Sequence, residues 1–261
     1  MLFRSWTRGR GGAAPGMLKL PGGVAVNGSG STFIVDAGNA RVQKFDGTGS
    51  FALEWGAAGA GNGEFAFSTC GESVGIATDA SNNVYVTDIG NHRVQKFAAD
   101  GTFITQWGGE GTGQGQMRYP LGLTIAPSGN IVVADSGNNR FQEFTPEGVF
   151  VSAWGELGTG PGQFKNPSAI AYDGTGARYV ADKNNYRIQK FTAEGVFVAE
   201  WGSKGAGSGQ FNYVFSIAVD SATRVYVADG GNARIQVFGP DGAYLGEYKS
   251  VGSRPGQIML P

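Results

Sequence analysis

A six-residue motif, Asp-x-Gly-Asn-x-Arg with small variations, recurs five times along this chain of 261 residues. The copies begin at Asp36, Asp88, Asp135, Asp182 and Asp229, so that successive copies are 52, 47, 47 and 47 residues apart. A period of this length is typical of proteins built from repeated supersecondary units. A motif that is present in every unit indicates a structural role more than a single active site.

The fourth unit shows what one repeat contains. Four short runs, each bounded by Gly, Asn or Asp, are Ser168–Asp173, Ala177–Asp182, Arg187–Phe191 and Val196–Trp201. Their length and alternation predict four antiparallel strands, here called a, b, c and d. Strand b is apolar on both faces, which requires burial on both sides. Copies packed around an axis satisfy this requirement, so the repeats predict an all-β propeller.

The repeated pattern resembles the NHL-repeat family over nearly the whole chain. The resemblance rests on Pro-x-x-Ile-Ala-Val-Asp, then Val-Tyr-Val-Ala-Asp-x-Gly-Asn-x-Arg-Ile-Gln-Lys-Phe, then Trp-Gly followed by a Gly-rich loop that ends in Gly-Gln-Phe. It implies an NHL-type β-propeller, typically with six blades. NHL modules are known as interaction domains, so the resemblance also implies binding of a partner, with no ligase activity on this chain.

We expect one propeller domain over residues 1–261 with five complete four-stranded blades. The units span about 24–55, 74–107, 122–154, 168–201 and 216–248. A lone strand of a sixth blade is expected at Leu2–Trp6, because Trp6 matches the tryptophan that closes strand d elsewhere. The simplest interpretation is a six-bladed ring cut within one blade. A closed ring of five blades stays open as the alternative.

Composition limits the classes of partner. The 20 basic and 21 acidic residues nearly balance, so the net charge gives no general attraction to nucleic acid or anionic membranes. No apolar run reaches the roughly 18 residues of a membrane span. Cys70 is the only cysteine and excludes an internal disulfide. The first residues lack the apolar stretch of a secretory signal, and the sequence assigns no compartment.

The charges nevertheless sort by face. Because the strands alternate in direction, the b–c turns and the d–a loops share one face and the a–b and c–d turns share the other. The first face carries fourteen basic and nine acidic residues, and the second carries two basic and eight acidic residues. We therefore expect a basic face opposite an acidic one.

Several motifs favour structure over chemistry. The motif Asp and Arg end neighbouring strands, where opposite charges can pair. The Gly-rich loops lead into a strand and recur in every unit, whereas a nucleotide loop opens a helix, so no nucleotide is expected. The tryptophans are expected to pack blade on blade. His92 is the only histidine, which is too few ligands for a zinc site with Cys70. We expect no metal, no cofactor and no catalytic set, and therefore no enzyme.

Positions that vary inside the constant frame are the candidate binding residues. They lie beside the motif arginines, after a motif aspartate, and before strand a, together with three of the arginines themselves: His92, Asn139, Tyr186, Lys183, Tyr119, Tyr213, Arg93, Arg140 and Arg187. A constant scaffold with unlike side chains at its turns is how a rigid platform acquires specificity. The leading hypothesis is a non-enzymatic scaffold that binds a protein or peptide.

Two alternatives stay open. Single-stranded RNA is possible on the basic face, where the exposed aromatic residues would stack on bases. A propeller enzyme of the amidating-lyase type is the other, but it would need central metal-binding histidines that one histidine does not supply.

Overall fold

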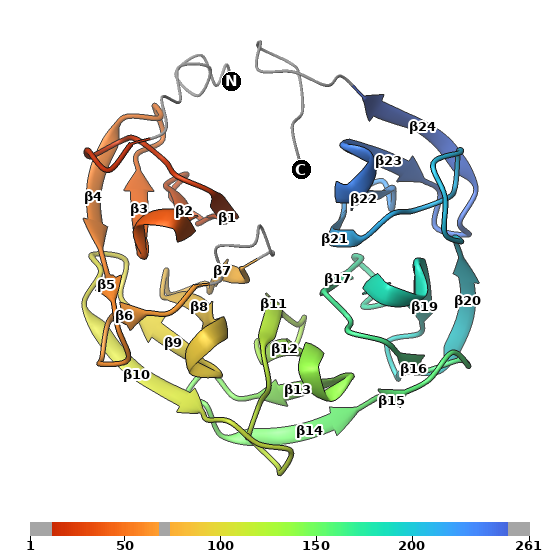
Figure 1. The fold of residues 1–261 in the computed structure, drawn as a ribbon, viewed down its shortest axis with the longest axis horizontal. Coiled ribbons are helices and arrows are strands. Elements are labelled where there is room, and N and C mark those ends of the chain that lie inside the picture. The colour runs from red at the N-terminus through yellow and green to blue at the C-terminus, as the bar shows by residue number, and fades with distance from the viewer. Residues whose placement is uncertain (1–11, 68–73, 250–261) are drawn as a thin grey trace.

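The computed structural model describes residues 12–67 and 74–249, which form five four-stranded antiparallel sheets around a central axis (Figure 1). The all-β, five-bladed propeller predicted from the repeats is therefore confirmed. In each sheet the strands follow chain order from the axis outward. The lone strand expected at Leu2–Trp6 lies outside the described residues.

The blades are numbered here in chain order. Blade 1 holds β1 (Pro21–Val26), β2 (Thr32–Asp36), β3 (Arg41–Phe45) and β4 (Phe51–Trp55). Blade 2 holds β7 (Ile76–Thr78), β8 (Val84–Asp88), β9 (Arg93–Phe97) and β10 (Phe103–Gly108). Blade 3 holds β11 (Pro120–Ile125), β12 (Ile131–Asp135), β13 (Arg140–Phe144) and β14 (Phe150–Trp154). Blade 4 holds β17 (Ala169–Tyr172), β18 (Arg178–Asp182), β19 (Arg187–Phe191) and β20 (Phe197–Trp201). Blade 5 holds β21 (Val214–Val219), β22 (Val225–Asp229), β23 (Arg234–Phe238) and β24 (Tyr244–Lys249).

Two short parallel ladders lie in the loops that join blades. They pair β5 (Ala57–Ala58) with β6 (Glu64–Phe65), and β15 (Glu156–Leu157) with β16 (Gln163–Phe164). No sequence pattern had predicted these two ladders. The starts of the units differ from the expected bounds by one to three residues, and their ends differ by at most one. In the fourth unit strand c has the expected bounds, and strand b ends at Asp182 as expected but begins at Arg178, one residue later than expected.

Each b–c turn is a single 3-10 turn that ends on a residue in the left-handed region. The turns are η2 (Ala37–Asn39), η3 (Ile89–Asn91), η4 (Ser136–Asn138), η5 (Lys183–Asn185) and η6 (Gly230–Asn232). The residues after them have φ of 50° to 57°, and they are Ala40, His92, Asn139, Tyr186 and Ala233. A non-glycine residue in this region is strained unless the surroundings hold it there. The motif therefore fixes the backbone of one variable residue per blade.

The hydrophobic core consists of four clusters, one at each junction between consecutive blades. We call the face that a blade turns toward the next blade its front, and the opposite face its back. At the junction of blades 2 and 3, Trp107 and Tyr85 on the front of blade 2 meet Phe144 and Leu123 on the back of blade 3. Strand b is therefore buried on both sides, as its sequence required.

Close backbone contacts at the axis hold neighbouring innermost strands together. The Gly122 N–H donates to the carbonyl of Ser168 in the next blade at 2.8 Å. A Cβ on Gly122 would lie 2.4 Å from that same oxygen, so only glycine permits the approach.

Candidate functional site

The b–c turns and the d–a loops lie together on one face of the ring, as strand parity predicted. Backbone hydrogen bonds tie each turn to a loop: Gly90 N–H donates to Ala66 O, and Asn184 N–H donates to Lys165 O, at 2.8 and 3.0 Å. We call this surface the loop face. The nine candidate binding residues lie at this face or directly beneath it.

A buried polar network underlies the loop face in every blade. In blade 4 the Oδ2 of Asp182 accepts hydrogen bonds from Arg187 Nε at 2.9 Å, Asn185 Nδ2 at 2.9 Å and Gln189 Nε2 at 3.2 Å. Its Oδ1 accepts from the backbone N–H of Lys165 at 2.8 Å. Asp182 is fully buried, so the carboxylate is satisfied only by these intramolecular donors.

A glutamine that was not among the predicted site residues also belongs to this network. The residue two places after each motif arginine is a fully buried glutamine, and these are Gln43, Gln95, Gln142, Gln189 and Gln236. Each donates both to the motif aspartate and to a loop carbonyl. Its recurrence in every strand c was the available signal, since a polar residue repeated in a buried strand needs fixed partners.

The three candidate arginines belong to this network. The side chains of Arg93, Arg140 and Arg187 are 9%, 18% and 8% exposed, and each Nε lies 2.7 to 2.9 Å from the motif aspartate. Their terminal nitrogens donate to loop carbonyls, as Arg93 does to Gly61 and Glu64. The structure thus places them beneath the loop face, where they fix the loops.

The other variable residues meet in pairs at the blade junctions. Tyr119 N–H donates to His92 Nδ1 at 3.0 Å, and the two rings lie 4.8 Å apart. The rings of Tyr186 and Tyr213 lie 6.2 Å apart. At the intervening junction Asn166 N–H donates to the Oδ1 of Asn139 at 2.9 Å. The lead-in residues Tyr119, Asn166 and Tyr213 also have positive φ, so both members of each pair have a constrained backbone.

Two lysines extend the pairs through contacts with aromatic rings. Lys204 Nζ lies 5.3 Å from the ring centre of Tyr186, and Lys183 Nζ lies 5.5 Å from that of Phe215. In contacts of this kind the negative face of the aromatic ring attracts the ammonium group. They hold positive charge beside the aromatic residues at the junction of blades 4 and 5.

A cavity of about 510 Å³ opens on the loop face. Apolar side chains of Phe67, Ile89 and Leu121 line it beside polar Asn166 and Asn184. Two of the candidate residues, Tyr119 and Lys183, also line it. The structure therefore brings these two candidates together at one cavity, and places His92 next to it through Tyr119.

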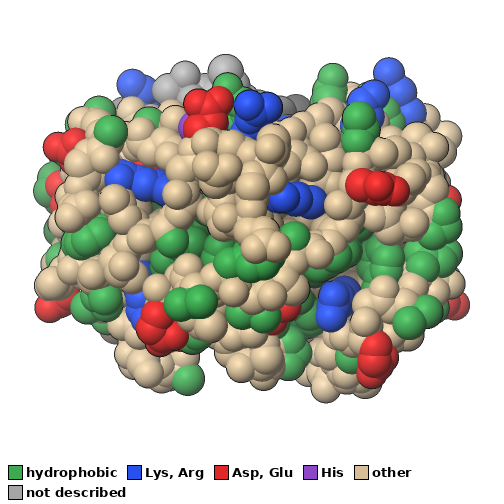
Figure 2. Space-filling view, turned by 90° about the horizontal axis from the view of Figure 1, so that it is seen from below, with side chains coloured by type: hydrophobic (Ala, Val, Ile, Leu, Met, Phe, Trp, Pro, Cys, Tyr) green, Lys and Arg blue, Asp and Glu red, His purple; other side chains and the backbone are tan. Residues whose placement is uncertain are grey.

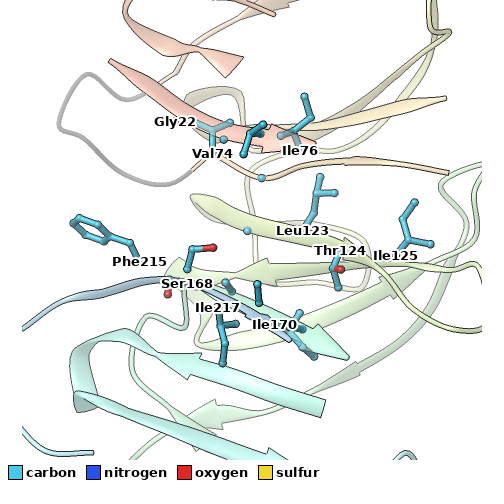
Figure 3. Close-up of a pocket in the computed structure, with 18 of the residues that line it drawn as sticks. Gly22, Val74, Ile76, Leu123, Thr124, Ile125, Ser168, Ile170, Phe215 and Ile217 are labelled. Atoms are coloured by element: carbon cyan, nitrogen blue, oxygen red, sulfur yellow. The ribbon is translucent and has the colours of Figure 1, made fainter. Parts of the chain in front are cut away.

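A second cavity, of about 600 Å³, lies on the axis where all five innermost strands converge. Figure 3 shows its apolar lining from successive blades, including Ile76, Leu123, Ile170 and Ile217. Ser168 is one of its few polar side chains, and its hydroxyl donates to the carbonyl of Val214 at 2.8 Å. None of the candidate binding residues lines this axial cavity.

Outside the motif pairs, the described residues of the loop face carry more positive than negative charge. The basic residues are Lys19, Arg118, Lys165, Lys183, Lys204 and Lys249, and the acidic residues are Glu64, Glu110 and Glu156. Figure 2 shows charged side chains on both rims and hydrophobic side chains on the outer wall between them.

Shifted pKa values occur on the face opposite the loops. Burial raises the pKa of Asp79, but hydrogen bonds from Asn83 and Tyr85 outweigh burial and hold it below its ordinary value. Burial, together with the bond to Asp79, raises the pKa of Tyr85. Asp173 and Tyr179 repeat this arrangement in blade 4.

Within residues 12–67 and 74–249, no three His, Cys, Asp or Glu side chains lie close enough together to hold a metal ion. Cys70 lies outside the described residues. Across the same ranges, no helix has the length and apolar character needed to cross a bilayer.

A profile of the NHL repeat matches residues 74–97, 117–144 and 211–238, which are strands of blades 2, 3 and 5 with their connections. The chain belongs to the NHL-repeat family. The predicted resemblance is thereby confirmed. No curated protein sequence matches the chain significantly.

Solved structures share the fold of this NHL propeller at low sequence identity. Virginiamycin B lyase from Staphylococcus aureus is 17% identical, with 90% of this chain and 71% of the lyase covered and a TM-score of 0.63. A gluconolactonase from Xanthomonas campestris is 16% identical, with 94% and 77% covered and a TM-score of 0.63. A chain of the nidogen–laminin complex is 13% identical, with 87% and 79% covered and a TM-score of 0.63. Enzymes and a binding complex thus both have this fold, which alone does not assign a function.

Proposed function

We propose that this NHL propeller is a non-enzymatic platform that binds a protein or peptide on its loop face. One observation carries the proposal: Tyr119 and Tyr213 are 57% and 45% exposed, yet both are held at positive φ on a frame of buried ion pairs. Tyrosine is enriched in the energetic centres of protein interfaces. A surface that is already ordered loses less entropy when a partner binds.

The cavity on the loop face supports the same proposal. It lies beside Tyr119 and offers the apolar surface of Phe67 and Leu121 next to the amide groups of Asn166 and Asn184. A hydrophobic pocket with a few fixed polar groups suits one anchoring side chain of a peptide. The chain in the nidogen–laminin complex offers a precedent for protein binding by a propeller of this shape.

The His92 side chain makes its contacts within the loop face. Its Nδ1 accepts a hydrogen bond from the backbone of Tyr119, and its ring packs against the tyrosine ring. These contacts support a role for His92 in positioning Tyr119, and not in proton transfer. This supports a binding function over an enzymatic one.

The test is a random peptide library displayed on phage and selected on the immobilised protein. We expect enriched peptides to lose at least about tenfold in affinity for a variant with Tyr119→Ser and Tyr213→Ser. The matched control is Val149→Ser, which removes an exposed apolar side chain (62% exposed) outside the loop face. Equal binding to the tyrosine variant and the control would contradict the proposal.

A gel shift with single-stranded RNA at low salt complements this selection. If RNA binds, and the binding is lost when Tyr119 and Tyr213 are replaced, the loop face is an RNA-binding surface and the proposal of a protein ligand is wrong. Burial of Arg93 and Arg187 leaves few arginines on this surface for phosphate contacts.

We also infer that the complete ring holds six blades. Figure 1 shows an opening in the ring between blade 1 and blade 5. Consecutive blades meet through their innermost strands, in the order β1, β7, β11, β17 and β21, and no contact of similar extent joins β21 to β1 among the described residues. The lack of such a contact between blades 1 and 5 supports the number of blades that the NHL resemblance implies.

A further inference from the structure

We propose that a cavity between blades 3 and 4 binds a small zwitterionic ligand, a molecule of the amino-acid type that carries one carboxylate and one ammonium group. The cavity lies on the face opposite the loop face, so this site is separate from the proposed protein-binding surface. It has a volume of about 390 Å³, and the a–b turns of both blades and the c–d turn of blade 4 line it. This volume is at the lower end of the range of small-molecule sites, roughly 300–1,000 Å³.

A lysine crosses the equivalent place at the other three junctions. It is the fourth residue of strand c, and it donates to a carbonyl in the c–d turn of the next blade at 2.8 to 3.0 Å. In the ladder it pairs with an aromatic residue of strand b, and its Nζ lies 5.1 to 5.5 Å from the centre of that ring. The pairs are Lys44 with Phe33, Lys96 with Tyr85, and Lys190 with Tyr179. A lysine and an aromatic ring therefore fill these junctions together.

The junction of blades 3 and 4 has neither of these residues. Glu143 is the fourth residue of strand c in blade 3, and it pairs in the ladder with Val132. An ionised carboxylate has no proton to donate to a carbonyl, so Glu143 cannot make the bond that the lysines make. Valine is also much smaller than phenylalanine or tyrosine. The two replacements explain why this junction contains a cavity.

A cation from blade 4 takes the carbonyl that the lysine would use. Arg178 Nη2 donates to Ala193 O at 2.8 Å, and Ala193 lies in the c–d turn where the other junctions have their acceptor. The guanidinium carbon lies 5.5 Å from the ring centre of Trp154 in blade 3. The first residue of strand b is uncharged in the other blades, where it is Thr32, Val84, Ile131 or Val225. This junction alone therefore presents an arginine in the cavity wall at that position.

The two charged side chains of the cavity do not neutralise each other. Glu143 and Arg178 both line it, yet they form no ion pair within the described part of the chain. Glu143 accepts hydrogen bonds only from neutral groups, Asn130 Nδ2 at 2.7 Å and the hydroxyl of Ser152 at 3.3 Å. The bond to Ala193 O is the one hydrogen bond of the guanidinium among the described residues, and its Nε is buried without a partner. Both charges are therefore available to a ligand.

The hydroxyl of Tyr172 is a third free group in the cavity wall. Tyrosines of strand b bond to the aspartate of their own a–b turn, and these are Tyr85, Tyr179 and Tyr226. Tyr172 has no such bond to any described residue, although it lines the cavity. Burial raises the pKa of Tyr172 to about 12, so the phenol stays neutral near pH 7. It can therefore donate a hydrogen bond to a ligand or accept one.

These groups specify the charge of the ligand. A carboxylate suits the guanidinium of Arg178, whose planar donors match two carboxylate oxygens. An ammonium group suits Glu143, which has lone pairs left after its two neutral donors. A ligand with only one charge would leave the opposite charge of the cavity partly desolvated and unpaired, which is costly. Ala126 and Pro127 provide an apolar wall for the side chain of an amino acid.

The test is calorimetric titration of the unmodified chain with each of the common L-amino acids at about pH 6, where an α-amino group is protonated and a glutamate is ionised. The strongest ligand is then compared with its carboxamide, which lacks the carboxylate, and with its N-acetyl derivative, which lacks the ammonium group. Glu143→Gln and Arg178→Gln remove the two charges from the protein. Arg224→Gln is the matched control, because it removes an exposed arginine of the same face outside this cavity.

We expect at least one amino acid to bind with a Kd below about 1 mM. Its two derivatives, and the two cavity variants, should each weaken binding by at least about tenfold, since each removes one charge-assisted hydrogen bond. The Arg224→Gln variant should bind as the wild type does.

Binding of none of the amino acids would overturn the proposal. Equal binding of a derivative that lacks one charge would do the same, and so would equal binding by the Glu143→Gln or Arg178→Gln variant in its folded form. The derivatives are measured on the unmodified chain, so the proposal is tested even where a substituted chain does not fold. Tyr119 and Tyr213 are unchanged throughout, so failure of peptide binding on the loop face does not affect this result.

Discussion

The indole ring of Trp107 lies 5.9 Å from the ring of Phe144, so that the last strand of blade 2 packs on the third strand of blade 3. The equivalent distances at the other three junctions are 5.7, 5.6 and 6.0 Å. Large aromatic side chains contribute much of the energy of such packing. The ring is therefore stabilised junction by junction, and each tryptophan is a place where one junction can be weakened alone.

Replacing the partly buried Trp107 by alanine is expected to lower the free energy of unfolding by roughly 3 kcal/mol, the lower end of the usual cost of removing a large aromatic side chain from a core. Trp107→Phe is expected to cost much less, because the buried indole Nε1 has no hydrogen-bond partner among the described residues. Urea unfolding followed by circular dichroism measures both. Equal losses for the two variants would contradict the stabilisation of this junction by packing of an aromatic ring.

The sequence predicted the blades well because the signals were local. In the fourth unit strand c was placed to the residue and strand b to within one residue, since an aspartate ends strand b and an arginine begins strand c across a four-residue turn. Their pairing is direct: Asp182 lies opposite Arg187 in the ladder. The start of strand a was less accurate, because its first residues contact a neighbouring blade and the sequence has no comparable local signal there.

The close approach of Gly122 to the next blade can be tested against a glycine that has no such contact. Gly122→Ala is expected to destabilise the protein markedly, because its Cβ would lie 2.4 Å from Ser168 O and 3.1 Å from Ala169 Cα in the next blade. Gly174→Ala is the matched control, since a Cβ there has open space and the backbone needs no positive φ. Thermal unfolding of both variants measures the difference. Similar melting temperatures would show that the innermost strands can separate without cost.

The candidate surface was predictable only in part. The variable residues His92 and Tyr119 were each selected from the sequence, yet they are 27 residues apart and their contact depends on how blade 2 sits against blade 3. No local pattern specifies that contact. For the arginines the sequence predicted pairing with the motif aspartates, as Arg187 does with Asp182. The loop carbonyls that accept hydrogen bonds from Arg187 are seen only in the structure.

Removing one partner of a buried motif pair is expected to be costly. Asp182→Asn should lower the free energy of unfolding by roughly 3 kcal/mol, because it removes the buried carboxylate that pairs with Arg187 Nε and leaves only Glu200, whose side chain is 44% exposed, beside the guanidinium. Arg224→Ala is the control. It breaks the Arg224–Asp220 pair, whose side chains are 53% and 26% exposed, and little change is expected. Chemical denaturation distinguishes the two, and equal effects would contradict a structural role for the motif.

Acid is expected to destabilise the fold through the aspartates of the a–b turns. Folding lowers the pKa of Asp79, so the ionised form is favoured in the folded state. Its contribution is present above the unfolded pKa of about 3.9 and is lost as the pH falls through the lower folded value. The difference in melting temperature between the wild type and Asp79→Asn should therefore shrink as the pH falls from 7 to below about 3. A constant difference would show that ionisation of Asp79 does not stabilise the fold.

Alkali is expected to act through the tyrosine at the other end of the same hydrogen bond. Burial, followed by the bond to Asp79, raises the pKa of Tyr85, so the folded state favours the neutral phenol. This contribution is complete below the unfolded pKa of about 10 and is lost as the pH rises through the folded value. The Tyr85→Phe variant keeps the ring at the junction with Trp107 but cannot ionise. Its melting temperature should therefore fall less steeply above pH 10 than that of the wild type, and parallel curves would show that Tyr85 ionises equally well in both states.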